Sequence, residues 1–432
     1  MPTLTRACSA MIALELCVAS CTSGGPPQQP AIAEVKHHGF RSDVPPEHRG
    51  NAAFDDVWWS GDGSLFMTSY HLSPQLRVWD GKSGALVTRL VASAVEGVPL
   101  LDGRGRRFVG RLEGKPELVV FDLGTGAPIG AIPEDAAGPR FPVGLTADGD
   151  AVVLAGPHGI EVWSLAGPAL LRKTATALTP AQYRPACVGG IPATLNEKHC
   201  WELSPGGHWL AAAITANDPP PGSSRFFLVN LASMAVEELS LPEGARDRTL
   251  ASFAFSPDDR RLAFGTYEGM WIYDITERSW GSLIPGQHRR NRYLGPVRFG
   301  ADGRRVVTLG DQMQTSVFDV ATGGLLGRLE PADWDWEGSF RVSDDGSRVV
   351  LYHIASDILE VLDGRDARRI GYVCPYYCNV RHKPMPVAFA VSPDGRTVAA
   401  SHRYGAALWR TDSDELVTPL EDPEMPALGP PQ

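Results

Sequence analysis

The sequence predicts an all-β fold made of eight copies of one four-stranded unit. A polar turn followed by an apolar, β-rich run returns roughly every 42 to 58 residues. Aligned on the turn residue, the copies are centred on Gly63, Gly105, Gly149, Gly207, Asp259, Gly303, Gly346 and Gly395. A repeat of this length built from short strands is typical of a β-propeller with one blade per repeat. Seven blades with one degenerate repeat is the alternative.

The first two strands of each unit flank the polar turn, which residues 392–395 (Ser-Pro-Asp-Gly) typify. Asp-Gly between alternating apolar runs is a strong hairpin signal, because glycine accepts a positive φ and Asp bonds its own backbone. Asp259 replaces the glycine in one copy, and Asp also tolerates the left-handed region. Residues 251–255 exemplify the strand before the turn, and residues 306–309 the strand after it.

The third strand of each unit ends in an aromatic or apolar residue. This position is occupied by Trp79, Phe121, Trp163, Val229, Tyr273, Phe318, Leu362 and Trp409. Because their spacing is that of the repeat, we expect these side chains to pack between neighbouring blades. A second turn, such as Ser83-Gly84, then leads into a fourth strand such as residues 85–90.

These units resemble bacterial WD-repeat propeller blades, and the Ser-Pro-Asp-Gly turns resemble those of related families in exported bacterial proteins. The resemblance covers about residues 50 to 421. It implies the fold, whereas a propeller scaffold supports many unrelated activities. The chain departs from the stricter pattern: Trp-Asp is intact only at Trp79-Asp80, and the Gly-His pair expected early in each repeat is missing.

The N-terminus predicts a lipoprotein signal. A single positive charge at Arg6 precedes a short, mostly apolar segment, and residues 18–21 (Val-Ala-Ser-Cys) match a bacterial lipobox. Cys21 would then be the lipidated first residue of the mature chain, holding it at a membrane surface. A plain secretory signal is the alternative.

The domain boundaries follow from this. We expect a signal peptide at 1–20, a flexible tether at 21–35, the WD40-like propeller at 36–425 and a disordered tail at 426–432. Residues 33–40 could add an outer strand beside the last blade and so close the ring.

Four cysteines follow the signal, and an even number in an exported domain predicts two disulfides. Proximity pairs Cys187 with Cys200 and Cys374 with Cys378. A zinc site is the alternative, because histidines lie near both pairs, but Cys-x₃-Cys-x₃-His is not a common zinc spacing. We expect no metal and no cofactor.

The insertions relative to the repeat predict the functional surface, since loops on a rigid scaffold carry function. Trp334 and Trp336 alternate with carboxylates in the insertion at 331–338, and Tyr376 and Tyr377 lie between two cysteines. Exposed aromatics of this kind can grip a peptide or stack on a sugar ring, although one Trp could instead cap a blade.

The function predicted is a non-enzymatic scaffold of the bacterial cell envelope that binds an unidentified protein or peptide. No nucleophile elbow, Walker loop or zinc-protease helix is present. A net charge of −10 disfavours nucleic acid as a partner, and we expect a monomeric propeller. The alternative is an enzyme or a carbohydrate- or cofactor-binding protein that uses the central channel. Candidate channel residues are His71, His158, His353 and His402, if their strands are innermost.

Overall fold

The computed structural model describes most of the chain between residues 56 and 423. The gaps within that range are residues 71–72, 92–99, 103, 112–114, 116, 134–139, 157–158, 175–182, 186–200, 217–224, 243–249, 267–268, 286–293, 311–313, 330–337, 354–357, 374–387, 403–404 and 414–415. In the described part, no helix is long and apolar enough to cross a bilayer.

The described residues form eight antiparallel sheets in chain order, each with four successive layers of strand. Blade 1 contains β1 (Asp56–Trp59), β2 (Leu65–Tyr70), β3 (Ser73–Asp80) and β4 (Leu86–Val91). Blade 2 contains β5 (Leu100–Leu101), β6 (Arg107–Arg111), β7 (Leu118–Asp122) and β8 (Pro128–Ile132). Blade 3 contains β9 (Phe141–Leu145), β10 (Ala151–Gly156), β11 (Gly159–Ser164) and β12 (Ala169–Lys173). Blade 4 contains β13 (Tyr183–Pro185), β14 (Trp201–Leu203), β15 (Trp209–Ala216), β16 (Arg225–Asn230) and β17 (Ala235–Leu239).

The second half of the ring repeats this plan. Blade 5 contains β18 (Leu250–Phe255), β19 (Arg261–Thr266), β20 (Gly269–Asp274), β21 (Ser279–Trp280) and β22 (Ile284–Pro285). Blade 6 contains β23 (Leu294–Phe299), β24 (Arg305–Gly310), β25 (Thr315–Asp319) and β26 (Leu325–Leu329). Blade 7 contains β27 (Gly338–Val342), β28 (Arg348–His353), β29 (Ile358–Asp363) and β30 (Arg369–Val373). Blade 8 contains β31 (Phe389–Val391), β32 (Thr397–His402), β33 (Gly405–Arg410) and β34 (Leu416–Pro419).

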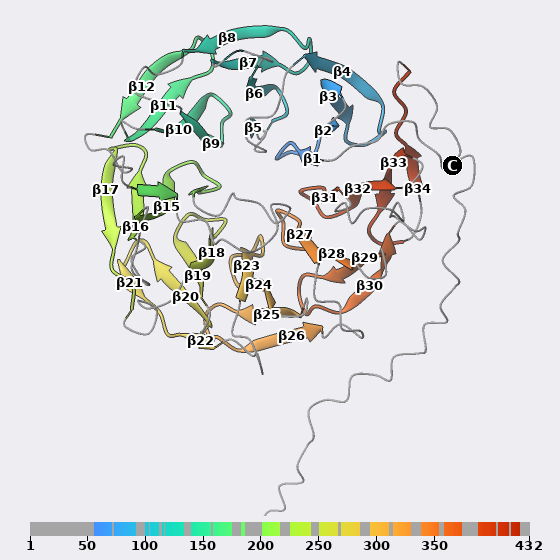
Figure 1. Cartoon of the computed structure of the whole chain (residues 1–432). Helices are drawn as coiled ribbons and strands as arrows, with labels where there is room; N and C mark the ends of the chain where they lie inside the picture. The colour runs from blue at the N-terminus through green and yellow to red at the C-terminus, as the bar shows by residue number, and fades with distance from the viewer. Residues whose placement is uncertain are drawn as a thin grey trace, which may run out of the picture. The chain divides into compact units, whose positions relative to one another are not determined.

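The blades form a ring, which confirms the eight-bladed propeller (Figure 1). First strands such as β5, β9, β23 and β31 lie nearest the centre, and fourth strands such as β4, β8, β12 and β26 lie at the rim. Eight apolar clusters join each blade to the next, including the last to the first. All eight residues predicted at the end of the third strand are buried, as expected for packing between blades.

Two blades depart from four continuous strands. In blade 4 both β13 and β14 pair with β15, so the innermost strand is interrupted by residues 186–200. Pro185 lies opposite Ile214 and Trp201 opposite Ala212, so the two ends of the interruption meet positions only two residues apart. In blade 5 the outermost strand is divided into β21 and β22, which both pair with β20.

The first turn of every blade adopts the conformation that the sequence predicts. The eight turn residues all have φ between 58° and 70°, including Asp259 at 58°. In blade 8 the Ser392 hydroxyl donates to Asp394 Oδ1 at 2.7 Å and accepts from the Thr397 amide at 3.0 Å, while the Gly395 amide donates to the Ser392 carbonyl. Most polar side chains of the repeat therefore form hydrogen bonds that stabilise the turn itself.

Close packing explains why glycine is needed at one of these turns. A Cβ on Gly346 would lie 2.3 Å from Cα of Gly300, in the equivalent turn of the preceding blade. The two turns are also hydrogen-bonded, since the Ala301 amide donates to the Asp345 carbonyl at 3.1 Å. The turns of blades 6 and 7 therefore form one continuous, tightly packed surface.

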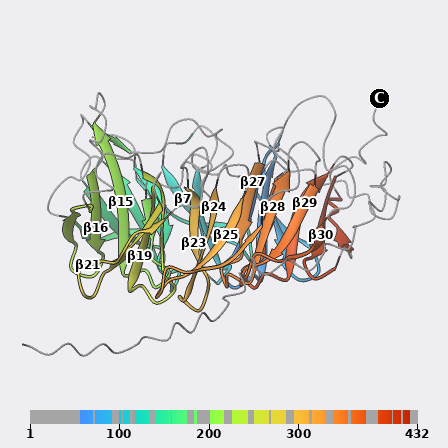
Figure 2. The ribbon, with the colours of Figure 1, turned by 90° about the horizontal axis from the view of Figure 1, so that it is seen from below.

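The antiparallel order gives the ring two different ends. Turns between first and second strands and between third and fourth strands lie at one end, which we call the tight-turn face. Connections from second to third strands, and from each fourth strand to the next blade, lie at the other end, which we call the variable face. Figure 2 shows strands such as β15, β24, β27 and β28 running between these two ends.

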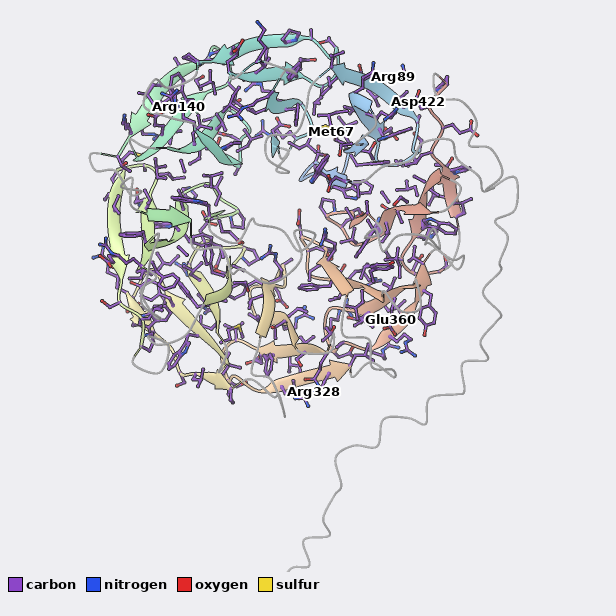
Figure 3. All side chains as sticks on the ribbon, viewed as in Figure 1. Met67, Arg89, Arg140, Arg328, Glu360 and Asp422 are labelled. Atoms are coloured by element: carbon purple, nitrogen blue, oxygen red, sulfur yellow. The ribbon has the colours of Figure 1, made fainter. Side chains whose placement is uncertain are left out.

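The ring is closed by the C-terminal segment after β34. Leu420 is fully buried in the cluster shared by blades 8 and 1, and its amide donates to the Ala406 carbonyl at 2.8 Å. The fully buried Asp422 then pairs with Arg77 of β3 at 2.5 Å and with Arg89 of β4. Figure 3 shows Arg89 and Asp422 side by side at this junction. Residues 33–40, which we expected to add a closing strand, lie outside the described residues.

Candidate functional site

The loop residues predicted to bind a partner lie outside the described residues. The same is true of the lipidation site and both predicted disulfides. These positions are Cys21, Cys187, Cys200, Trp334, Trp336, Cys374, Tyr376, Tyr377 and Cys378. Their predicted roles therefore stay predictions.

The strands on either side of these loops are described, and they fix the face from which each loop departs. The insertion with Trp334 and Trp336 joins β26 to β27, and the insertion with Tyr376 and Tyr377 joins β30 to β31. Both are connections between consecutive blades, so both start and end at the variable face. The topology thus brings the two predicted aromatic loops to the same face, at the neighbouring junctions of blades 6, 7 and 8.

A second candidate site is formed by charged residues on the innermost strands. Glu202, Arg298 and Arg341 each lie five positions before the turn glycine of their blade and one residue before the end of their strand. The other blades carry Trp58, Leu100, Gly144, Ala254 and Ala390 at this position. Aligning the repeats on the turn glycine would have revealed these three charges, but we did not single them out from the sequence.

The contact between Glu202 and Arg298 places this group at the axis of the ring. Arg298 Nη1 lies 3.7 Å from Glu202 Oε2, although β14 and β23 belong to blades 4 and 6. Blade 5 stands between them, so their side chains can meet only on the axial side of β18. Asp56 of blade 1 likewise acts electrostatically on Arg341 of blade 7, across blade 8. We call Asp56, Glu202, Arg298, Arg341 and Asp344 the axial charge cluster.

Arg341 is held without a carboxylate partner. Its Nη1 donates to the Phe340 carbonyl at 3.0 Å, and its guanidinium lies 5.5 Å from the centre of the Phe389 ring. Among the described residues, no Asp or Glu lies within ion-pair distance of it. Burial, together with the positive charge of Arg298, lowers the pKa of Arg341 to about 10, although the charge of Asp56 acts in the opposite direction. Arg341 therefore remains protonated at neutral pH, but at a cost in free energy.

The pKa values of two acids of the axial charge cluster, Glu202 and Asp344, are shifted toward the neutral form. Burial raises the pKa of Glu202, although the charge of Arg298 and the backbone of Phe255 act in the opposite direction. Burial also raises the pKa of Asp344, which the Arg298 charge partly offsets. Asp56 is the first residue of β1. The cluster thus holds two guanidiniums whose neighbouring carboxyls are poorly able to neutralise them.

A Ser-His-Asp grouping occurs at the turn of blade 4, but its geometry does not suit nucleophilic catalysis. The buried Ser204 hydroxyl donates to Asp259 Oδ2 at 2.8 Å, and His208 Nδ1 lies 2.8 Å from that same oxygen. In a catalytic triad the histidine must lie between the serine and the carboxylate. Here the carboxylate lies between them, and it also accepts the Gly206 amide at 2.9 Å. Asp259 thus fastens one turn to the next.

Two further buried carboxylates, Glu161 and Glu360, make contacts within their own blades. Glu161 of blade 3 accepts hydrogen bonds from Arg140 at 2.8 Å and from the Trp163 indole at 2.9 Å. Glu360 of blade 7 pairs with Arg369 on the adjacent strand. In the part of the chain that the structure describes, no three His, Cys, Asp or Glu side chains are arranged to hold a metal ion.

The candidate histidines do not occupy the innermost strands where the structure describes them. His353 and His402 are the last residues of β28 and β32, which are the second strands of their blades. His71 and His158 lie outside the described residues. In blade 1, where Trp-Asp is intact, the Trp79 indole donates to Thr68 Oγ1 at 2.9 Å, which fastens the third strand to the second.

The ring and its turns define a WD40-type β-propeller. No protein-family model matches the chain, and no curated protein matches it. Among solved structures, the C-terminal WD40 domain of Sif2 is similar, with a TM-score of 0.55 at 10% identity over 85% of this chain and 97% of that one.

Two further propellers are less similar. The β-propeller domain of Myceliophteria thermophila Cps50 (Swd1) has a TM-score of 0.45 at 13% identity, covering 83% of this chain and 97% of its own. Kuenenia stuttgartiensis hydrazine synthase has the same TM-score and identity, covering 88% of this chain and 99% of its own. At such identities the likeness concerns the fold alone.

Proposed function

We propose that this chain is a non-enzymatic binding scaffold that holds a protein or peptide partner on its variable face. The observation that supports it is topological: the aromatic insertions at 331–338 and 372–386 depart from the same face at neighbouring blade junctions. Aromatic side chains are typical anchor residues of protein interfaces. The eight packed blades supply the rigid support that such loops need.

The proposal also includes a location. The lipobox at residues 18–21 favours anchoring through Cys21 at the bacterial cell envelope, and a secreted form is the alternative. The chain would then present its propeller to a partner at the periplasmic or outer-membrane face. Metabolic labelling with a palmitate analogue, compared between the natural chain and Cys21→Ala, tests the anchor. Equal labelling of both chains would remove it from the proposal.

The partner-binding role is tested by capture from solubilised membranes. The full-length chain is used as bait beside the Trp334→Ala/Trp336→Ala and Tyr376→Ala/Tyr377→Ala variants. A matched control is Arg396→Ala, whose side chain is 85% exposed at the tight-turn face of blade 8. We expect both aromatic variants to lose a partner that the natural chain and the control retain.

Two results would contradict this proposal. Equal recovery of the partner with all four baits would exclude the aromatic loops as its docking site. Loss of the partner with Arg396→Ala alone would move the docking site to the opposite face. The rival function, an enzyme or a carbohydrate- or cofactor-binding protein, would be favoured if a small molecule co-purified and dissociated on mutation of the axial charge cluster.

A further inference from the structure

The axial charge cluster contains an arrangement that the partner-binding proposal does not use. Its two arginines lie on neighbouring blades at the same position of the repeat, one residue before the end of β23 and β27. Both strands end there in a first turn, so the arginines lie toward the tight-turn face. This is the end of the ring opposite to the aromatic loops.

Several other arginines of the described residues are matched to a carboxylate at hydrogen-bond distance, although Arg106, Arg278 and Arg396 lie 3.6–3.9 Å from theirs. Arg77 lies 2.5 Å from Asp422, Arg140 lies 2.8 Å from Glu161, and Arg369 pairs with Glu360. Arg298 differs, since its nearest carboxylate oxygen, on Glu202, is 3.7 Å away, beyond hydrogen-bond distance. Arg341 differs further, because it has no such partner among the described residues. Two close guanidiniums with so little compensation repel each other.

Both guanidiniums are held in place by the chain itself. Arg298 Nη1 donates to the Val297 carbonyl at 2.9 Å, and Arg341 Nη1 donates to the Phe340 carbonyl at 3.0 Å. A guanidinium has five N–H donors, so each arginine keeps several for another acceptor. The stacking of Arg341 over the Phe389 ring further restricts its orientation. Restrained donors lose little conformational entropy when a ligand binds.

The underlying turns are fixed, and the cluster can be reached from outside. The Ala301 amide donates to the Asp345 carbonyl, and the Asp345 amide donates to the Pro393 carbonyl at 3.0 Å, which links the turns of blades 6, 7 and 8. The Arg298 side chain is 39% exposed.

We propose that Arg298 and Arg341 form a binding site for a ligand carboxylate at the tight-turn end of the ring axis. A ligand carboxylate can accept from either guanidinium, and the planar donors of a guanidinium suit its two oxygens. A single negative charge fits best, because Asp56 supplies negative charge nearby, which disfavours a doubly charged phosphate. Either a small carboxylic acid or an acidic peptide segment can supply this group.

The site is tested by fluorescence anisotropy with a fluorescein-labelled peptide of alternating Gly and Glu. A peptide of alternating Gly and Gln is the neutral counterpart. We expect the Glu peptide alone to bind, and Arg298→Ala and Arg341→Ala each to weaken it by about tenfold or more, as for a charged hydrogen bond. Arg341→Lys should bind the Glu peptide less tightly than the natural chain but more tightly than Arg341→Ala, because lysine keeps the positive charge and lacks the planar guanidinium. Arg396→Ala should leave binding unchanged.

Glu202→Gln provides the most discriminating test, because it should strengthen binding of the Glu peptide, whereas the arginine variants should weaken it. It removes the carboxylate that competes for Arg298, so the Glu peptide should bind more tightly. A merely structural role of Glu202 would weaken binding instead. Succinate and inorganic phosphate are then added as competitors. Displacement by succinate at concentrations similar to the peptide assigns the site to small acids, and displacement only by the peptide assigns it to a protein segment.

Several outcomes would overturn the carboxylate site. These are equal binding of the Glu and Gln peptides, no effect of either arginine variant, an equal loss with Arg396→Ala, or stronger displacement by phosphate than by succinate. If an alanine variant fails to show the natural melting temperature, Arg341→Lys and Glu202→Gln decide the question. The site does not depend on the partner-binding proposal, because the aromatic variants and the arginine variants alter opposite faces.

Discussion

Removal of the Asp422 carboxylate is the most direct perturbation of ring closure. The Asp422 side chain is 1% exposed and pairs with Arg77 at 2.5 Å, while Arg77 is itself 3% exposed. It also pairs with Arg89, of which 22% is exposed. Asp422→Ala therefore removes the carboxylate that pairs with the buried Arg77 guanidinium. It also removes a carboxylate from the Arg89 guanidinium, which lies nearer the surface.

The expected magnitude follows from these exposures. Removing one partner of a buried ion pair costs about 3–5 kcal/mol, because the remaining charge stays desolvated. Arg89 can turn toward water, so Arg77 accounts for most of the loss. The matched control is Asp412→Ala, which removes an equally short pair with Arg410 at 2.9 Å where both side chains are about half exposed. An exposed pair contributes about 0–1 kcal/mol.

Equilibrium urea unfolding followed by tryptophan fluorescence measures both losses. We expect the free energy of unfolding to fall several times further for Asp422→Ala than for Asp412→Ala. The double variant Arg77→Met/Asp422→Leu should recover much of the loss, because it removes the stranded charge and keeps an apolar filling. Equal losses for the two single variants would refute the idea that this ion pair holds the last blade to the first.

Three further expectations concern the turns and the cysteines. Gly346→Ala should lower the free energy of unfolding by at least about 1–2 kcal/mol in urea titration, because φ is 62° and its Cβ would meet Gly300 Cα at 2.3 Å; an unchanged midpoint would argue against the packed turns. Hydrogen bonds from Ser83 lower the pKa of Asp80 below 3.8. Its stabilisation is therefore present above about pH 4 and lost as the pH falls through the folded-state pKa, so the melting difference between the natural chain and Asp80→Ala should vanish near pH 2; a constant difference would refute this. Mass spectrometry of the chain under non-reducing conditions should find the disulfide Cys187–Cys200, because the ends of that insertion meet positions of β15 only two residues apart; free thiols or bound zinc would contradict it.

The repeat could be predicted because its signals are local. A turn residue with positive φ, its Asp and its serine lie within a few positions of one another, so each blade carries its own evidence. Even the exceptional Asp259 follows the prediction, with φ of 58°. The burial of residues such as Trp79 and Trp409 was likewise predictable from the period alone.

The axial charge cluster and the ring closure could not be predicted in the same way. Arg298 meets Glu202 across blade 5, and this contact depends on how the blades pack around the ring. Asp422 is separated from Arg77 by almost the entire propeller, so no local pattern relates them. The sequence does carry the unusual charges at the repeat position of Glu202, Arg298 and Arg341, but their proximity is a property of the closed ring.

The position of Asp422 has a consequence for the order in which the protein matures. Blade 1 is synthesised first, yet its Arg77 and its apolar face find their partners only when blade 8 and the segment after it have emerged. Until then the apolar face of blade 1 and the Arg77 guanidinium lack these partners in the nascent chain. The ring therefore cannot close before the segment that carries Asp422 has been made.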